Sequence, residues 1–325
     1  MEGLKLRPYA GEGDVSDIVR ISNAEFKADD VPEHVELANQ IAYYRHPTDS
    51  FDPARDVTLA LVDGHAVAYG SIYWVDSNDG EYREFRVDGR VDPAWRRRGI
   101  GTALLRHNEE LARALAATRP TERRLAYGTW SGTTQAGDIA LLERNGYEQA
   151  RWFFDMTRPT LDDIAEPPMP AGLELRPVTQ DTIHQIWRAD IEAFRDHWGG
   201  GDDSDEALNR YIDSPGHDPS LWLIAWDGDE VAGGIINGIE REENEALGVQ
   251  RGWLHSVFTR RPWRKRGLAS ALIGRSLKLL RERGMTSAVL GVDADNPTGA
   301  LGLYEQAGFE ASYRATAWRK PMERP

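Results

Sequence analysis

The sequence has no cysteine among its 325 residues. This absence excludes disulfide bonds, a thiol nucleophile and thiolate metal ligands, and it leads us to expect a cytoplasmic protein. The eight histidines have neither the H-x-x-x-H nor the H-E-x-x-H spacing, so we expect no metal site. No uncharged apolar run approaches the roughly 18 residues of a membrane span, and Met1 to Tyr9 predicts a short strand instead of a signal peptide.

Positive charge is also scarce, because 39 Lys and Arg residues face 53 Asp and Glu residues and leave a net charge of −14. This balance argues against binding to nucleic acid or to an anionic membrane, and it is compatible with a cationic substrate such as an amine. The sequence lacks the phosphate loop of NTPases, the G-x-S-x-G elbow of α/β-hydrolases and the G-x-G-x-x-G dinucleotide fingerprint. Those three enzyme classes therefore have no support.

What the sequence does contain is an internal repeat. Short segments of the first half recur in the second half in the same order. They are Leu6-Arg7-Pro8 with Leu175-Arg176-Pro177, Val62-Asp63-Gly64 with Trp226-Asp227-Gly228, Arg96 to Gly101 with Arg264 to Ala269, and Glu143 to Tyr147 with Glu305 to Phe309. We predict two copies of one domain, residues 1–159 and 173–325, joined by a proline-rich linker over 160–172.

Each copy predicts a strand, two helices, three strands, a helix, a strand, a helix and a last strand. This order is typical of an α/β fold with a mixed sheet. The last strands are expected at Arg151–Met156 and Ser312–Trp318, each closing its own copy. In the second copy, helices are predicted over Thr182–Phe194, Asp205–Ile212 and Leu268–Arg283.

A basic, glycine-containing turn, Trp263 to Ala269, connects the β-rich run Gly252–Thr259 to the amphipathic helix that begins at Leu268. The start of a helix presents unpaired backbone N–H groups and the positive end of the helix dipole, which suit a phosphate. A second motif, N-x-x-G-A-x-x-L-Y-x-x-x-G-F, covers Asn296 to Phe309.

The R-x-x-G-x-A turn followed by this second motif resembles the GCN5-related N-acetyltransferase (GNAT) superfamily, and the resemblance covers the chain twice. It implies two tandem GNAT-like acyl-CoA N-acyltransferase domains of the α/β class. It also implies acetyl-CoA as co-substrate, without a metal. The expected reaction is direct transfer of an acetyl group to a primary amine, on a small molecule, within a ternary complex. A non-catalytic tandem acyl-CoA sensor is the alternative, and the oligomeric state is not indicated.

The resemblance also implies site residues. The pyrophosphate of acetyl-CoA is expected on the turn of each copy, the pantetheine arm along a strand edge, and Asn296 at the arm or as a helix cap. The expected cofactor-binding residues are Arg264, Lys265, Arg266, Gly267, Leu268, Ala269 and Ser270, then Val257, Phe258 and Thr259, and in the first copy Arg96, Arg97, Arg98, Gly99, Ile100, Gly101 and Thr102.

Tyr304 is the expected proton donor to the departing thiolate, or the group that stabilises its sulfur; the alternative is a tyrosine that only packs in the core. The first copy has Leu142 at this position and lacks a counterpart of Asn296 within Ser131 to Thr134. We therefore expect the first copy to be degenerate, able to bind CoA but a poor catalyst.

A general base is needed as well, and the family's strand glutamate is missing from Trp253 to Ser256. His255 is one candidate, since period-two alternation places it on the same face as Val257; the alternative is a structural histidine. Glu243, in an acidic cluster with three neighbouring glutamates, is the other candidate, and the alternative there is a solvated turn. The segment Asp196-His197-Trp198 is expected where the family lines its acceptor pocket.

Overall fold

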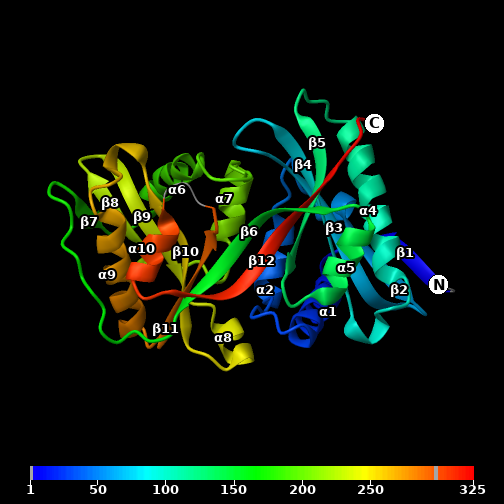
Figure 1. Cartoon of the computed structure of the whole chain (residues 1–325), viewed down its shortest axis with the longest axis horizontal. Helices are drawn as coiled ribbons and strands as arrows, with labels where there is room; N and C mark the ends of the chain where they lie inside the picture. The colour runs from blue at the N-terminus through cyan, green and yellow to red at the C-terminus, as the bar shows by residue number, and fades with distance from the viewer. Residues whose placement is uncertain (1–2, 296–298) are drawn as a thin grey trace. The chain divides into compact units, whose positions relative to one another are not determined.

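The structure, a computed structural model, describes residues 3–295 and 299–325 (Figure 1). The chain forms two compact units. Unit 1 consists of Met1–Trp152, Trp198–Pro215 and Ala315–Pro325, and unit 2 consists of Phe153–His197 and Gly216–Arg314. Both units have the predicted α/β plan, a mixed sheet covered by helices. None of the helices in the described ranges is long and apolar enough to cross a membrane.

The sheet of unit 1 has the strand order β1-β2-β3-β4-β5-β12. The strands β1 to β4 pair antiparallel, β4 and β5 pair parallel, and β12 pairs antiparallel with β5. Their bounds are Leu4–Pro8 (β1), Val57–Val62 (β2), His65–Asp76 (β3), Tyr82–Val91 (β4), Arg124–Gly132 (β5) and Glu310–Pro321 (β12).

Helices cover this sheet on both faces, which explains why five of the six residues of β2 are buried. Val57 and Leu59 of β2 pack with α1 and α2, whereas Ala60 and Val62 pack with α4. The helices of the unit are α1 (Val15–Ala28), α2 (Leu37–Arg45), α3 (Pro53–Asp56), α4 (Ile100–Ala117), α5 (Ala136–Arg144) and α7 (Asp205–Ile212), with 3-10 turns η1 (Glu12–Asp14) and η2 (Pro93–Trp95).

The sheet of unit 2 repeats the plan with the order β6-β11-β10-β9-β8-β7. The strands β7 to β10 pair antiparallel, β10 and β11 pair parallel, and β6 pairs antiparallel with β11. Their bounds are Glu148–Arg158 (β6), Glu174–Arg176 (β7), Leu223–Asp227 (β8), Glu230–Gly238 (β9), Arg251–Thr259 (β10) and Ser287–Asp293 (β11).

The predicted apolar face of the long helix of unit 2 is confirmed. In α9 (Leu268–Glu282), the residues at helical spacing, Leu268, Leu272, Ile273, Leu277 and Leu280, are all buried against the sheet. The other helices are α6 (Gln180–Phe194), α8 (Arg241–Leu247) and α10 (Ala300–Gln306), with 3-10 turns η3 (Pro219–Leu221) and η4 (Arg261–Trp263). The acidic cluster around Glu243 therefore lies on a short helix, not in an open turn.

The last strands are exchanged between the halves, contrary to the prediction from the sequence. β6, predicted to close the first copy, pairs with β11 from Phe153 to Arg158, and β12, predicted to close the second copy, pairs with β5 from Ala315 to Pro321. Figure 1 shows β12, in red, beside β5. The repeat makes the open edges of β5 and β11 equivalent, so local sequence does not decide which edge each last strand joins.

Two further segments differ from their expected surroundings. The helix α7 forms at its predicted bounds but belongs to unit 1, where Arg210 lies 4.1 Å from the ring centre of Tyr43. The proline-rich segment 160–172 is packed along α9, because Gly274 has no side chain to hold it away. A Cβ at Gly274 would lie 2.3 Å from the carbonyl oxygen of Ala165, and Arg275 donates to the carbonyl of Pro167 at 2.9 Å.

Candidate active site

The two basic turns have the same backbone conformation. Each is extended at its first arginine and left-handed at the next residue and at the glycine. In the first turn the angles are φ −64° and ψ 162° at Arg96, φ 64° at Arg97 and φ 83° at Gly99. In the second turn they are φ −63° and ψ 156° at Arg264, φ 60° at Lys265 and φ 82° at Gly267. Left-handed residues within a turn direct successive N–H groups into one concave surface, which is a common anion site.

A helix begins directly after each turn. The first intrahelical hydrogen bonds are donated by Ala103 to Gly99 at 3.0 Å and by Ala271 to Gly267 at 3.1 Å. The N–H groups that precede these bonds have no partner within their own helix, and they lie at the positive end of the dipole. Lys265 and Arg266 are exposed beside them. The second turn therefore has the donors and the charge that suit a pyrophosphate.

The first arginine of each turn fixes the turn to the C-terminal end of a helix from the start of its half, α1 for Arg96 and α6 for Arg264. Arg264 donates to Asp196 at 2.8 Å and to the carbonyls of Ala193 and Thr259 at 3.0 Å. In the first half, Arg96 binds both carboxylate oxygens of Asp29, at 2.7 and 2.6 Å.

Asp196 is therefore an anchor of the turn, and these contacts do not place it in an acceptor pocket. Hydrogen bonds from Arg261 and Arg264 hold the pKa of its carboxyl well below the usual range, so it stays ionised.

The parallel strands of each unit separate near these turns. The pairing of β4 with β5 ends at Arg86 and Gly128, and the pairing of β10 with β11 ends at Trp253 and Val289, although the strands continue beyond these points. The segment Val257–Thr259 pairs with β9 on one edge, while its other edge lies past the last pair with β11. Backbone groups on such an edge can bind an extended ligand as an added strand would.

A β-bulge in β10 corrects the expected position of His255. The register with β9 shifts between Leu254 and Ser256, so His255 is the extra residue. Leu254 is buried in the core under α9, and Val257 packs against the same core. The bulge inverts the alternation of the strand between them. The prediction that His255 and Val257 share a face is therefore wrong.

The two predicted bases, His255 and Glu243, both make hydrogen bonds with neighbouring side chains. The imidazole of His255 stacks on Trp253 at 5.7 Å and makes a hydrogen bond with Glu240 at 3.0 Å. Glu243 is buried and accepts hydrogen bonds from Arg251 and from the indole N–H of Trp253, both at 2.8 Å. These bonds give Glu243 a structural role, connecting α8 to the start of β10.

Tyr304 lies on α10 with only 6% of its surface exposed, and its ring meets Phe309 edge to face at 6.2 Å. Burial raises the pKa of its phenol to about 12, so the hydroxyl remains protonated at neutral pH. Leu142 is the equivalent residue of unit 1, and it lines a pocket there. Asn296, the other residue predicted from the second motif, lies outside the described residues.

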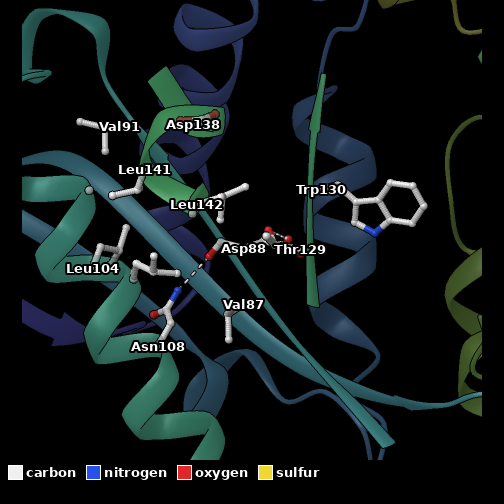
Figure 2. A pocket seen from close by; sticks show the side chains of 13 residues that line it. Val87, Asp88, Val91, Leu104, Asn108, Thr129, Trp130, Asp138, Leu141 and Leu142 are labelled. Carbon is white, nitrogen blue, oxygen red and sulfur yellow. Dashed lines mark hydrogen bonds between the residues drawn. The ribbon is translucent and has the colours of Figure 1, made fainter. Parts of the chain in front are cut away.

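That pocket of unit 1, about 80 Å³ in volume, lies where β4 and β5 separate (Figure 2). It adjoins a cleft of about 290 Å³ around the turn of Arg96 to Thr102. Its polar wall includes Asp88, which accepts a hydrogen bond from Thr129 at 3.0 Å and whose pKa is raised by burial. Asn108 donates to the backbone carbonyl of Asp88 at 2.8 Å.

Sequence reasoning missed Asp88 and Asn108. The available signal for Asn108 was an asparagine on the apolar face of a helix. Asp88 lies in a strand with several other charged residues, so its sequence context did not distinguish it. Among the residues that the structure describes, no group of three or more His, Asp or Glu side chains is placed to hold a metal ion. The expectation that no metal is used remains a prediction from the sequence.

Comparison with known proteins identifies the fold. The model of the acetyltransferase (GNAT) family matches residues 17–126 and 183–309. The chain is 30% identical over 272 residues to a mycothiol acetyltransferase of Geodermatophilus obscurus, covering 82% of each chain. It is also 30% identical over 300 residues to that of Salinispora arenicola, covering 91% of this chain and 89% of the relative. Both matches are long enough to extend over the two copies that the sequence repeat predicts, a layout similar to mycothiol synthase.

Solved structures of GNAT proteins have the same fold as this chain. A GCN5-related N-acetyltransferase from Sphaerobacter thermophilus has a TM-score of 0.73 at 26% identity and covers 100% of this chain and 97% of its own. A tandem GNAT protein from the clavulanic acid biosynthesis pathway has a TM-score of 0.71 at 16% identity, covers 98% of both chains and supports the fold alone.

The predicted acetyl transfer to an amine is confirmed by these relatives. The protein is an N-acetyltransferase that moves an acetyl group from acetyl-CoA, the co-substrate of this family, to an amine on a small molecule. The non-catalytic sensor is not favoured. With a family match in each half and relatives that span most of its length, the chain belongs to the acetyltransferase (GNAT) family.

Proposed function

We propose that the second half of the chain, residues 173–325, carries out the acetyl transfer, with donor and primary amine bound together in a ternary complex. Three observations support this assignment. The turn at Arg264 to Ala269 has the conformation of an anion site, the edge of β10 is free of β11 over Val257–Thr259, and Tyr304 follows on α10.

Backbone N–H groups from Arg264 to Ser270 would hold the pyrophosphate, and Lys265 and Arg266 would add positive charge. The edge of Val257, Phe258 and Thr259 would bind the pantetheine arm, with one N–H polarising the thioester carbonyl. This placement fits the chain because Gly267 is left-handed and has no Cβ at the point of closest approach.

Tyr304 would act on the sulfur as it departs. A phenol with a pKa of about 12 holds its proton more tightly than a thiol with a reference pKa of about 8.5. Tyr304 is therefore better suited to donate a hydrogen bond that stabilises the thiolate than to give up its proton completely. The raised pKa supports this one of the two roles expected from the sequence.

The first half, residues 1–159, would bind CoA at most. Its turn from Arg96 to Thr102 has the same backbone as the second turn, but Leu142 replaces the tyrosine. A leucine side chain cannot donate a hydrogen bond to a departing thiolate.

The acceptor would be a small polar amine. The names of the relatives make an amine related to mycothiol the first compound to test. The net charge of −14 suits a substrate that is a cation in solution. A cytoplasmic location remains a prediction from the composition.

Thiol release from acetyl-CoA, screened over amino sugars, amino acids, aminoglycosides and polyamines, tests the proposal. We expect release with at least one amine, and a fall in kcat of about 100-fold for Tyr304→Phe. Tyr44→Phe, a buried tyrosine of unit 1, is the control and should keep wild-type turnover. Full activity in Tyr304→Phe would refute the role of the phenol. Tight acetyl-CoA binding without thiol release for any amine would favour the sensor.

A further inference from the structure

A carboxylate and a hydroxyl that the sequence did not single out meet behind the separated edge of β10. The hydroxyl of Ser256, on β10, donates to a carboxylate oxygen of Asp190, on α6, at 2.5 Å. Burial between helix and sheet raises the pKa of Asp190 to about 6. A half-buried carboxylate of this kind is costly to ionise, and such groups gather at functional sites.

The internal repeat relates Ser256 of the second half to Asp88 of the first half. Ser256 precedes the left-handed Gly267 by the same number of residues as Asp88 precedes Gly99. In unit 1, Asp88 lines the pocket at the separation of β4 and β5 (Figure 2). Ser256 therefore occupies the corresponding point of unit 2, next to Val257 and beyond the last pair of β10 with β11.

Each half thus has a carboxylate either at this strand position or hydrogen-bonded to the residue there. The first half has it on the strand, as Asp88, and the second half has a hydroxyl on the strand with Asp190 behind it. The other candidate bases of the second half are engaged elsewhere, since His255 binds Glu240 and Glu243 accepts from Arg251.

We infer that Ser256 and Asp190 form the proton relay of the acetyl transfer: Ser256 accepts the proton of the attacking amine and passes its own proton to Asp190. In this relay Ser256 contacts the amine, and Asp190 acts through Ser256. The inference rests on the proposed function, in which the second half is the catalytic one.

The step balances in atoms and charge. The ammonium first gives one proton to solvent. The lone pair of the neutral amine nitrogen then attacks the thioester carbon, the C–N bond forms and the C–S bond breaks. One N–H proton leaves through Ser256 to Asp190, and the sulfur departs as a thiolate that accepts a hydrogen bond from Tyr304. The thiolate takes a proton from solvent, and Asp190 returns its proton to solvent when the product leaves.

In the described contacts, no other ionisable group is hydrogen-bonded to Asp190. The Asp190 carboxyl should therefore titrate independently of other groups. The helix α6 packs against β9 and β10. Between Val231 and Gly238, β9 has no titratable residue. The titratable residues of β10 are Arg251 and His255, which bind Glu243 and Glu240, and those of α6 are Asp181, His184, Arg188 and Glu192, of which Glu192 binds Arg260.

The test is the pH profile of kcat, measured with the fastest amine of the screen at saturation. The wild type should lose activity below about pH 6, because Asp190 is then protonated and cannot accept. Asp190→Asn and Ser256→Ala should lower the plateau about 100-fold and remove this acidic limb. Ser256→Thr, which keeps the hydroxyl, should retain the limb. Asp181→Asn, an exposed aspartate on the same helix, should match the wild type.

Calorimetric titration with acetyl-CoA separates a relay from a structural role. The inference predicts an unchanged affinity in Asp190→Asn and Ser256→Ala, and a matching fall in both affinity and kcat would overturn it. A wild-type limb and plateau in both variants would also overturn it. Should Asp190→Asn not fold, Ser256→Ala decides by itself. If the wild type transfers acetyl to no amine, the proposed function is refuted. If transfer is lost in Tyr304→Phe but kept in Asp190→Asn and Ser256→Ala, the relay alone is refuted.

Discussion

At the scale of single residues, the candidate site is built from groups whose burial changes their ordinary chemistry. Tyr304, Asp190 and Asp138 all have a pKa above their usual range, and burial is the largest cause for each. A raised pKa keeps a phenol protonated, and it moves a carboxylate toward the neutral range in which it can accept a proton. The same burial costs stability wherever the group must ionise.

Asp190→Asn should therefore stabilise the protein while it impairs catalysis. The folded pKa of about 6 lies above the usual 3.8, so stability falls as the pH rises from about 4 to 6, and the full cost of about 1–3 kcal/mol is present above that window. Urea unfolding at pH 7.5 should show the variant more stable than the wild type by this amount, with little difference near pH 4. Equal or lower stability at pH 7.5 would contradict the assignment.

Asp138 should weaken the binding of CoA to the first half at neutral pH. It lines the cleft at the turn of Arg96, and burial and the charge of Glu25 raise its pKa to about 7. Below pH 7 the carboxyl is neutral and no longer repels a pyrophosphate, so binding should strengthen as the pH falls from 8 to 6. Calorimetry should find this trend in a Gly267→Asp background, which disables the second turn, and Asp138→Asn should abolish it. An affinity independent of pH would count against this role.

At the scale of elements, two glycines seven residues apart in the chain have different structural roles. Gly267 is left-handed at the turn, with open space around its Cα, whereas Gly274 lies in α9 against the segment 160–172. Substitution should therefore separate ligand binding from packing.

Gly267→Ala should raise the KM for acetyl-CoA about tenfold with a loss of about 1 kcal/mol in stability, since alanine is strained at φ 82°. Gly274→Ala should cost about 1–3 kcal/mol, because its Cβ would displace the carbonyl of Ala165, and should leave this KM unchanged. Steady-state kinetics and urea unfolding measure both effects. Gly137→Ala, in α5 with nothing near its Cα, is the control for stability, and an equal loss there would invalidate the comparison.

At the scale of the whole molecule, the exchange of the last strands makes each unit depend on both halves of the sequence. Trp318 of β12 is buried in unit 1, where its indole N–H donates to Ser131 at 2.8 Å, and Met156 of β6 is buried in the core of unit 2. Without β12, the edge of β5 would present unpaired backbone groups.

The isolated fragment 1–159 should therefore not fold to a stable monomer, whereas a chain cleaved within 160–172 should remain associated. Size-exclusion chromatography of the fragment and of the cleaved chain tests both outcomes. The intact chain should unfold in one transition by fluorescence and by circular dichroism. A fragment 1–159 with the stability of the intact chain, or two separate unfolding transitions, would refute this dependence.

The sequence by itself determined the features that local chemistry controls. The two turns, the apolar face of α9 and the repeat follow from glycine, charge and periodicity, so they were predictable residue by residue. The tertiary structure decided three features that involve residues far apart in the chain. These are the edge that each last strand joins, the bulge that turns His255 away from the face of Val257, and the meeting of Asp190 with Ser256. Each depends on hydrogen bonding and burial between distant elements, and no local pattern in the sequence reports such contacts.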